Sequence, residues 1–215
     1  MSDESPAHAW NQRYESTPSL WSPDPNAALV EFASGLPAGR ALDIGAGEGR
    51  NSVWLATRGW EVTALDVSHV ALARAVERAA AAGVPLRCVV GDWREHVPAD
   101  GSLELVVVSF MHPDPHERPS MFERAARAVA PGGHLFVTGV HDVDHGRRGP
   151  PDRDRLHTPE RLREALEGLL AVLRCDTVSY ERERAGGREV VTDVVGIARR
   201  LAVRDGCRRA KAASR

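Results

Sequence analysis

The sequence predicts an α/β protein with a doubly wound, mostly parallel sheet of seven strands and an antiparallel hairpin at one edge. From Arg40 onward, short apolar runs rich in β-branched residues alternate with longer amphipathic stretches, a pattern typical of the strand–helix units of a parallel sheet. Two β-rich segments flank Gly186-Gly187 near the end of the chain, and a glycine turn of this kind predicts a hairpin.

The expected elements follow one another along the chain. We predict strands at 41–44, 61–65, 86–90, 103–108, 134–140, 173–183 and 188–200. We predict helices at 50–58, 68–82, 117–129 and from 158 onward. The strand at 103–108 is a near-continuous apolar run, which is typical of a strand covered on both faces, so it should lie near the centre of the sheet.

Local signals set the ends of these helices. Ser68 is a favourable N-cap for the alanine-rich helix, and Gly83 marks its end. Pro131-Gly132-Gly133 should stop the preceding helix, because proline and glycine are the strongest breakers. Thr158 caps the last helix, and Pro159 fits its first turn, where a missing N–H costs nothing. Residues 142–157 are rich in Gly, Pro, Asp and Arg and should form a loop.

The length of 215 residues favours one domain, because folding units usually hold about 100–200 residues. We expect residues 40–201 to form it. Residues 1–39 are expected to be an N-terminal helical extension and lid, and residues 202–215 a basic flexible tail.

Composition narrows the range of partners. The chain has 28 Lys and Arg against 30 Asp and Glu, so it lacks the basic field that draws proteins to nucleic acid or to anionic membranes. Its three cysteines are widely spaced without a CxxC pair, which argues against a disulfide scaffold or a cysteine zinc site. The N-terminus is polar, and no run of about 18 apolar residues occurs. We expect a cytoplasmic monomer or homodimer with no membrane or nucleic-acid partner.

The most informative stretch reads Leu42-Asp43-Ile44-Gly45-Ala46-Gly47-Glu48-Gly49-Arg50. Its glycines lie between a predicted strand and a predicted helix, where a ligand can approach the backbone closely. The dinucleotide fingerprint G-x-G-x-x-G would need a glycine where Arg50 stands. Asp43 and Glu48 repel a pyrophosphate but attract an ammonium and a sulfonium. The loop therefore favours S-adenosylmethionine over a dinucleotide.

Two later strand ends agree with this hypothesis. Asp66 ends the second strand about 20 residues beyond the loop, where a carboxylate can accept hydrogen bonds from ribose hydroxyls. Asp92 follows the third strand and could accept from an adenine amino group, while Trp93 or its backbone lines the ring pocket. A tight turn or a helix cap would explain each feature singly, but their agreement at three strand ends favours one cofactor site.

These residues resemble the class I S-adenosylmethionine-dependent methyltransferases. The motifs that carry the resemblance are Leu42–Gly49, Ala64-Leu65-Asp66 and Gly91-Asp92, and the resemblance spans residues 10–200 approximately. Three further stretches are similar to the tellurite-resistance methyltransferase group and its small-molecule relatives: Trp10-Asn11-Gln12-Arg13-Tyr14, Gly49-Arg50-Asn51-Ser52 and Pro131-Gly132-Gly133-His134-Leu135.

The resemblance implies a Rossmann-like seven-stranded sheet with its last strand antiparallel, the cofactor across the strand ends and the substrate under an N-terminal flap. The implied cofactor contacts are Asp43, Gly45 and Gly47 at the methionine moiety, Asp66 at the ribose, Asp92 and Trp93 at the adenine, Trp10 and Tyr14 in the lid, and Asn51, Val67 and Ser109 beside these motifs. Asn11 stands where the family motif usually has aspartate.

Methyl transfer is an in-line displacement from a sulfonium that is already a good leaving group, so alignment and exclusion of water can supply most of the acceleration. A general base is therefore optional. The candidates are His112 and His116, just past the fourth strand. The alternative is that both belong to a proline-rich surface loop.

Arg147 and Arg148 follow the fifth strand and are candidate ligands for an anionic acceptor, such as a small oxyanion or a carboxylate. Asp144 and Asp152 neutralise part of this charge, so a solvated loop with ion pairs is an equal alternative. Histidines and acids cluster in these loops as they do around metals, but the displacement needs no metal and we expect none.

We therefore expect an enzyme that transfers a methyl group from S-adenosylmethionine to an oxygen, nitrogen, sulfur or chalcogen oxyanion nucleophile of a small molecule. The alternatives are an NAD-dependent oxidoreductase, which Arg50 and the acidic loop disfavour, and a cofactor-binding module without turnover. The acceptor stays open, because one scaffold hosts many chemistries.

Overall fold

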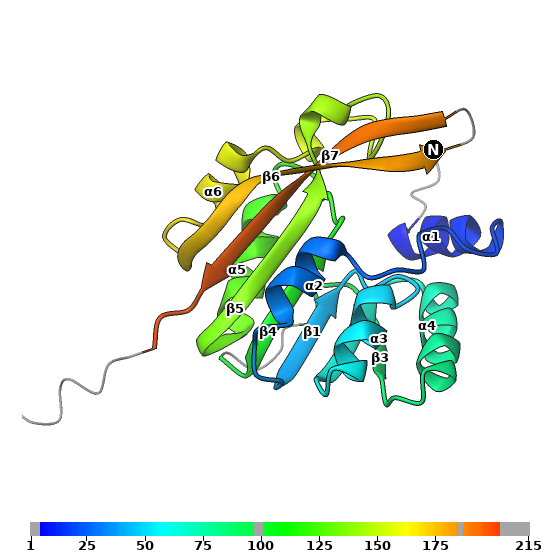
Figure 1. Cartoon of the computed structure of the whole chain (residues 1–215), viewed down its shortest axis with the longest axis horizontal. Helices are drawn as coiled ribbons and strands as arrows, with labels where there is room; N and C mark the ends of the chain where they lie inside the picture. The colour runs from blue at the N-terminus through cyan, green and yellow to red at the C-terminus, as the bar shows by residue number, and fades with distance from the viewer. Residues whose placement is uncertain (1–4, 97–100, 185–186, 203–215) are drawn as a thin grey trace, which may run out of the picture.

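A seven-stranded sheet with helices on both faces forms the body of the molecule (Figure 1). The computed structural model describes residues 5–96, 101–184 and 187–202. The strand order is β3-β2-β1-β4-β5-β7-β6. Residues 203–215, where we expected a flexible tail, and part of the Gly186-Gly187 turn lie outside the described residues.

The elements of the structure agree closely with the predicted ones. The strands are β1 (Arg40–Ile44), β2 (Glu61–Asp66), β3 (Arg87–Val90), β4 (Leu103–Ser109), β5 (Val129–Val140), β6 (Ala171–Arg184) and β7 (Gly187–Arg199). The α-helices are α1 (Pro6–Glu15), α2 (Ala27–Ala33), α3 (Arg50–Thr57), α4 (His69–Ala81), α5 (Arg118–Ala128) and α6 (Pro159–Leu166). Two short 3-10 turns, η1 (Asp142–Asp144) and η2 (Arg153–Arg155), lie in the predicted loop.

The pairing of the strands predicts a ligand site at the carboxyl ends of β1 and β4. Strand β1 pairs in parallel with β2 and with β4, so the chain first builds outward to β3 and then returns to the other side of β1. Ligands of doubly wound sheets bind at such a reversal, outside the carboxyl ends of the strands. Strand β7 is antiparallel to both β5 and β6, which confirms the predicted edge hairpin.

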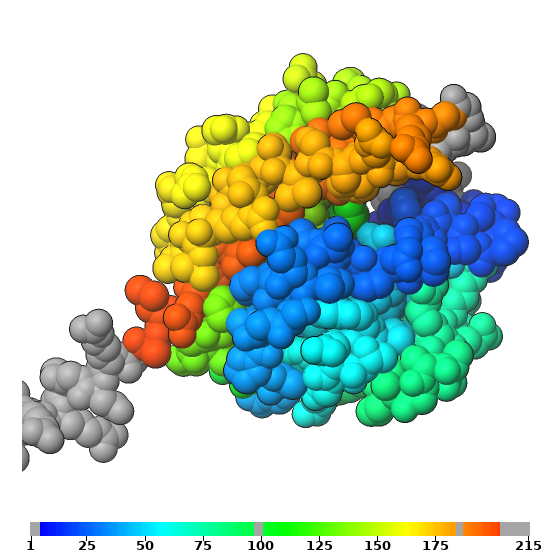
Figure 2. Space-filling model, in the orientation of Figure 1, coloured from blue at the N-terminus to red at the C-terminus, as the bar shows by residue number. Residues whose placement is uncertain are grey.

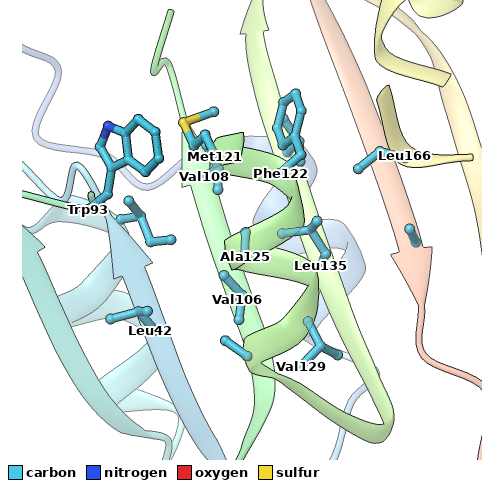
Figure 3. Packing of buried hydrophobic residues seen from close by; sticks show 14 of the residues in the cluster. Leu42, Trp93, Val106, Val108, Met121, Phe122, Ala125, Val129, Leu135 and Leu166 are labelled. Atoms are coloured by element: carbon cyan, nitrogen blue, oxygen red, sulfur yellow. The ribbon is translucent and has the colours of Figure 1, made fainter. Parts of the chain in front are cut away.

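The core lies on both faces of the sheet. Val106, Val107 and Val108 of β4 are fully buried and point alternately to the two faces, which confirms β4 as a central strand. One face packs against α5 and α6, and the other against α2 and α3. Figure 3 shows the first cluster, with the Trp93 ring beside Leu42 and Met121. Burial of each large apolar side chain contributes about 1.5–3 kcal/mol.

Both predicted helix caps are present. The Ser68 hydroxyl accepts a hydrogen bond from the Ala71 N–H at 3.1 Å, and the Thr158 hydroxyl accepts one from the Arg161 N–H at 3.2 Å. These bonds satisfy donors that the first turn of a helix leaves without partners. The two helices therefore begin where the sequence indicated.

The Pro131-Gly132-Gly133 stretch does not stop helix α5, contrary to our prediction. The helix ends at Ala128, because Val129 already pairs with Leu103 of β4. The proline and glycines instead form a bulge inside β5, between that pair and the pair of Leu105 with His134. Within the described ranges, every helix is too short or too polar to span a bilayer.

Gly139 of β5 leaves room for two histidine rings. A Cβ atom at Gly139 would overlap the His157 ring and would lie 3.1 Å from Nε2 of His112. His157 lies at the end of the segment that follows β5, and it pairs with His141 in an isolated parallel bridge. The missing side chain thus allows this segment to pack on the sheet.

We predict that Gly139→Ala lowers the free energy of unfolding by about 1–3 kcal/mol, because the added methyl group overpacks a buried contact. Urea denaturation followed by circular dichroism measures the change. Gly35→Ala is the control, because the nearest atom to its new Cβ is 4.0 Å away and its free energy should change little. Equal stability of Gly139→Ala and the parent would contradict the packing argument.

Candidate active site

The glycine loop at the end of β1 is held by the end of β2. Gly45 and Gly47 have left-handed φ angles of 71° and 54°, which glycine adopts at no steric cost. The N–H groups of Gly45 and Ala46 donate to the Leu65 carbonyl at 2.8 and 3.0 Å. The Gly47 N–H donates to Oδ2 of Asp66 at 2.8 Å. These bonds fix the loop in an open curve around its glycines.

Asp66 has acceptor capacity left after it has fixed this loop. Its Oδ1 accepts from the Ser68 N–H at 2.8 Å, so each carboxylate oxygen holds one backbone donor. A carboxylate offers about four acceptor positions, so two remain for a ligand such as a pair of hydroxyls. Burial raises the pKa of Asp66, and its backbone donors counter this effect. We expected Asp66 at the ribose, and its place at the crevice suits that role.

Asp43 is a buried carboxylate with one unpaired oxygen. Its Oδ2 accepts from the Ser52 hydroxyl at 2.6 Å, while Oδ1 has no hydrogen-bond partner among the described residues. Burial raises the pKa of Asp43 to about 6, and the Ser52 hydrogen bond and the charge of Arg50 act against this rise. A buried charge without full pairing costs free energy, so this site favours a cationic ligand.

The N-terminal segment forms a cover over the glycine loop. In Figure 1 this segment starts at α1, which lies beside α4, and continues to α2. It passes over the end of the sheet where the glycine loop lies. Tyr14 is buried, and its hydroxyl oxygen accepts from Nε1 of Trp21 at 3.0 Å. The Trp10 ring lies 5.9 Å from that of Tyr14. A Cβ atom at Gly47 would be 2.8 Å from the Tyr14 hydroxyl, so the cover touches the loop directly.

Glu48 binds this cover rather than adding a free charge to the loop. Its carboxylate accepts from the N–H groups of Leu20 and Trp21 and forms an ion pair with Arg74 at 2.8 Å. Arg74 also donates to the Tyr14 carbonyl at 2.7 Å. We expected Glu48 to repel phosphate, but its partners neutralise it. The negative charge of the site therefore comes from Asp43 and Asp66.

Several expected cofactor contacts have structural partners in this arrangement. Oδ1 of Asn51 accepts from the Asn26 N–H at 2.9 Å, at the start of α2. Asn11, in place of the family's usual aspartate, accepts from the Ser68 hydroxyl at 2.8 Å. Val67 is partly buried between Asp66 and Ser68. The Ser109 hydroxyl at the end of β4 is buried and has no described partner. Their contact with a cofactor stays a prediction.

The end of β3 differs from the expected adenine pocket in one respect. Asp92 forms an ion pair with Arg94 at 2.6 Å, and the Arg94 guanidinium lies 4.9 Å from the centre of the Trp93 ring. The Trp93 side chain is 9% exposed and packs in the core cluster of Figure 3, so its contact with an adenine ring stays a prediction. Asp92 at the adenine amino group stays a prediction.

The contacts of His112 do not favour the role of general base. Its Nε2 accepts from the Val140 N–H at 3.0 Å, so the lone pair that would take a proton is engaged. Burial, together with the smaller effect of the neighbouring His157 ring 5.2 Å away, lowers the pKa of His112 to about 3. The ring therefore stays neutral and holds β5 to the segment after β4. His116 is exposed, beside Asp114 and Glu117, and nothing links it to the crevice.

Arg147 and Arg148 do not form the free anion site that we considered. Arg148 is 9% exposed and lies between Asp144, at 3.1 Å, and Asp193, at 2.7 Å. Arg147 also pairs with Asp144. Asp193 accepts a second bond from the Tyr180 hydroxyl at 3.0 Å. Two buried carboxylates neutralise these arginines, so the network ties the loop after β5 to the β6–β7 hairpin.

Sequence reasoning did not identify Arg50 and Phe110 as a pair. Among the described residues, Phe110 is the one non-glycine with a positive φ, at 55°, and such a backbone is strained by about 1–3 kcal/mol. This turn at the end of β4 places the Phe110 ring 5.4 Å from the Arg50 guanidinium. A signal for Arg50 did exist, because a cation at the start of a helix opposes the helix dipole. No sequence signal marks the conformation of Phe110.

Comparison with known proteins agrees with this geometry. Residues 41–133 match the sequence model of a methyltransferase domain. The chain is 39% identical over 101 residues, or 44% of its length, to a release factor glutamine methyltransferase of Bordetella pertussis, and covers 37% of that protein. It spans between 34% and 47% of the first three curated relatives.

Two solved structures share the fold. One, from work on the conversion of a disulfide bond into a thioacetal group during echinomycin biosynthesis, is 21% identical with a TM-score of 0.74 and covers 91% of both chains. The other, TehB from Haemophilus influenzae, is 18% identical with a TM-score of 0.68 and covers 90% of this chain and 66% of that one. At these identities the likeness shows the fold alone.

We predict that acid destabilises the protein partly through His112. Its folded pKa of about 3 lies below the ordinary 6.5, so the unfolded chain takes up a proton first and stability falls as the pH drops below 6.5. At about pH 5 the loss is about 1–2 kcal/mol for this histidine. His112→Gln keeps an acceptor for Val140 and does not titrate.

The measurement compares urea denaturation of the parent and of His112→Gln at neutral pH and at about pH 5. The free energy of unfolding of the parent should fall more steeply than that of the variant, so the gap between them narrows in acid. Parallel loss in both proteins would show that His112 does not carry the effect.

Proposed function

We propose that this chain, which carries a class I S-adenosylmethionine-dependent methyltransferase domain, transfers a methyl group from S-adenosylmethionine to a small-molecule acceptor. The observation that carries the proposal is the buried Asp43 carboxylate with an unpaired oxygen, two residues before a loop of left-handed glycines. An anionic site of this kind suits a ligand with an ammonium and a sulfonium, and it opposes a diphosphate.

The residues present fit the cofactor. Asp43 and the glycine loop would hold its methionine half, the free acceptor positions of Asp66 would take the ribose hydroxyls, and Asp92 the adenine. When bound, S-adenosylmethionine supplies an electrophilic methyl group on a sulfonium leaving group. The chain itself needs to supply position and a dry environment.

The N-terminal cover is suited to exclude water. Tyr14 and Trp21 lie on the glycine loop, and Glu48 and Arg74 bind the segment between them through backbone groups. Removal of water strengthens the electrostatic interactions inside a site and prevents side reactions. Lid segments of this kind open for exchange and close for the reaction.

A dedicated base is not part of the proposal. His112 engages its lone pair with Val140, and its burial keeps it neutral. An in-line displacement can proceed by alignment alone when the nucleophile is a thiol, an oxyanion or another group that loses its proton easily. We therefore favour an acceptor that presents an oxygen, nitrogen, sulfur or chalcogen oxyanion nucleophile already prepared for attack.

A small acceptor is favoured over a macromolecule. Acidic and basic residues nearly balance, so the chain offers no basic stripe for RNA. One curated relative is named a release factor glutamine methyltransferase. Of the two solved structures with the same fold, one comes from work on echinomycin biosynthesis and the other is TehB. Incubation with labelled S-adenosylmethionine and a panel of thiols, oxyanions, phenols, amines, ribosomal RNA and release factor tests the proposal. Transfer to RNA or protein alone would reject it.

We predict that Asp66→Ala weakens binding of S-adenosylhomocysteine by about 1–3 kcal/mol, because charge-assisted hydrogen bonds to the ribose and the support of Gly47 are lost. Isothermal titration calorimetry measures the affinity. Asp176→Ala, an exposed carboxylate on β6, is the matched control and should bind as the parent does. If the parent binds NADH instead of S-adenosylhomocysteine, the cofactor assignment is wrong.

We predict that the affinity for S-adenosylmethionine falls as the pH drops below about 6. The pKa of Asp43 is raised to about 6, so below this value it takes up a proton and no longer attracts the cationic ligand. The loss approaches about tenfold per pH unit. Asp43→Asn should bind weakly at neutral pH with a flatter profile, and an unchanged profile in this variant would remove Asp43 from the site.

A further inference from the structure

Arg50 is a cation for which the described structure provides no hydrogen-bond acceptor or ion-pair partner. It is the first residue of α3, and its recorded contact is the Phe110 ring, 5.4 Å from the guanidinium carbon. Burial lowers the pKa of Arg50, while the charges of Asp43, Tyr180 and Asp193 raise it. The guanidinium thus lies partly out of water with five N–H donors available.

The neighbouring carboxylates are already engaged elsewhere. Asp193 accepts from Arg148 and Tyr180, and Asp43 accepts from Ser52. Both influence Arg50 through space, but no ion pair joins either of them to it in the described part of the chain. The helix dipole also opposes a cation at the start of α3. The position therefore leaves the donors of Arg50 available to a further anion.

Two hydroxyl groups on the same face of the sheet also have no partner. Ser109 of β4 and Thr138 of β5 face each other in register, two residues beyond the pair of Val107 with Phe136, and both hydroxyl oxygens are buried without a described hydrogen bond. This is the face that α3 covers. Arg50 thus begins the helix above a polar region at the ends of β4 and β5.

The surface is hollowed on this side of the molecule. Figure 2 shows the hollow between the β6–β7 hairpin, in orange, and the N-terminal segment, in blue. Tyr180 and Asp193 come from the hairpin and, after Asp43 of β1, act on the charge of Arg50. Arg50 thus lies against Phe110 at the end of β4, where the charges of both β1 and the hairpin act on it.

We propose that Arg50 binds an anionic group of the methyl acceptor, a carboxylate or a related oxyanion, between the glycine loop and the β6–β7 hairpin. This inference rests on the proposed function and narrows its substrate class to small anionic molecules. The planar guanidinium suits two parallel hydrogen bonds to such a group, and the Phe110 ring below supports its orientation. Arg147 and Arg148 cannot take this role, because Asp144 and Asp193 neutralise them.

A carboxylate that binds Arg50 has a second possible source, which is the methionine moiety of the cofactor itself. Binding measurements separate the two sources. The probes are S-adenosylhomocysteine, which has that carboxylate, and its carboxamide, which keeps the ammonium but lacks the carboxylate. The variants are Arg50→Gln, Arg50→Lys and the control Arg58→Gln, an exposed arginine at the other end of α3.

The main experiment measures binding of acetate, benzoate, acetamide and benzamide to the full chain saturated with S-adenosylhomocysteine, by calorimetry. We expect the parent and Arg58→Gln to bind at least one carboxylate about tenfold more tightly than its amide. Arg50→Gln should lose this preference, and Arg50→Lys should keep part of it. At about pH 8, where Asp43 is ionised, all should bind S-adenosylhomocysteine alike.

Three results would overturn the inference. The parent could bind no carboxylate better than its amide, or Arg50→Gln could keep the preference of the parent. Alternatively, Arg50→Gln could weaken S-adenosylhomocysteine about tenfold and leave its carboxamide unchanged, which would assign Arg50 to the donor carboxylate. A failure of the proposed function is distinct, because it appears as absent binding of S-adenosylhomocysteine or absent methyl transfer in the parent. The carboxylate preference is therefore also measured without cofactor.

Discussion

The hydrogen bond from the Gly47 N–H to the Asp66 carboxylate joins the ends of β1 and β2, and the candidate site is built around it. The same carboxylate accepts from Ser68, which in turn caps α4. One acidic side chain therefore fixes a glycine loop and the start of a helix. The N-terminal cover then packs on this fixed loop, so its position also depends on the link between the two strands.

Most charges near the crevice are paired, which makes the exceptions informative. Glu48 is satisfied by Arg74 and by the cover, and Arg148 by Asp144 and Asp193. Asp43 keeps an unpaired oxygen, and Arg50 has no acceptor in the described structure. Unpaired buried charges are costly to a fold and tend to occur where a ligand completes them. These two residues, of opposite sign, are close neighbours in the chain at the two ends of the glycine loop.

One of the two candidate bases, His112, makes structural contacts together with His157. His112 accepts from the backbone of β5, and His157 donates from Nε2 toward the Met111 carbonyl at 3.2 Å. Gly139 leaves space for both rings. This packing secures the long segment between β5 and α6, which in turn carries Arg148 to the hairpin. The segment thus shapes the hairpin side of the crevice without supplying a base.

The sequence by itself determined the fold class, the helix caps and the acidic glycine loop. These follow from short-range periodicity and from the backbone preferences of single residues such as Ser68 and Gly47. It did not determine the bulge at Pro131-Gly132-Gly133, which exists because Val129 pairs with a distant strand. It also did not reveal which charges are neutralised: Arg148 and Glu48 find partners far away in the chain. Those pairings depend on three-dimensional proximity, and only the tertiary structure decides it.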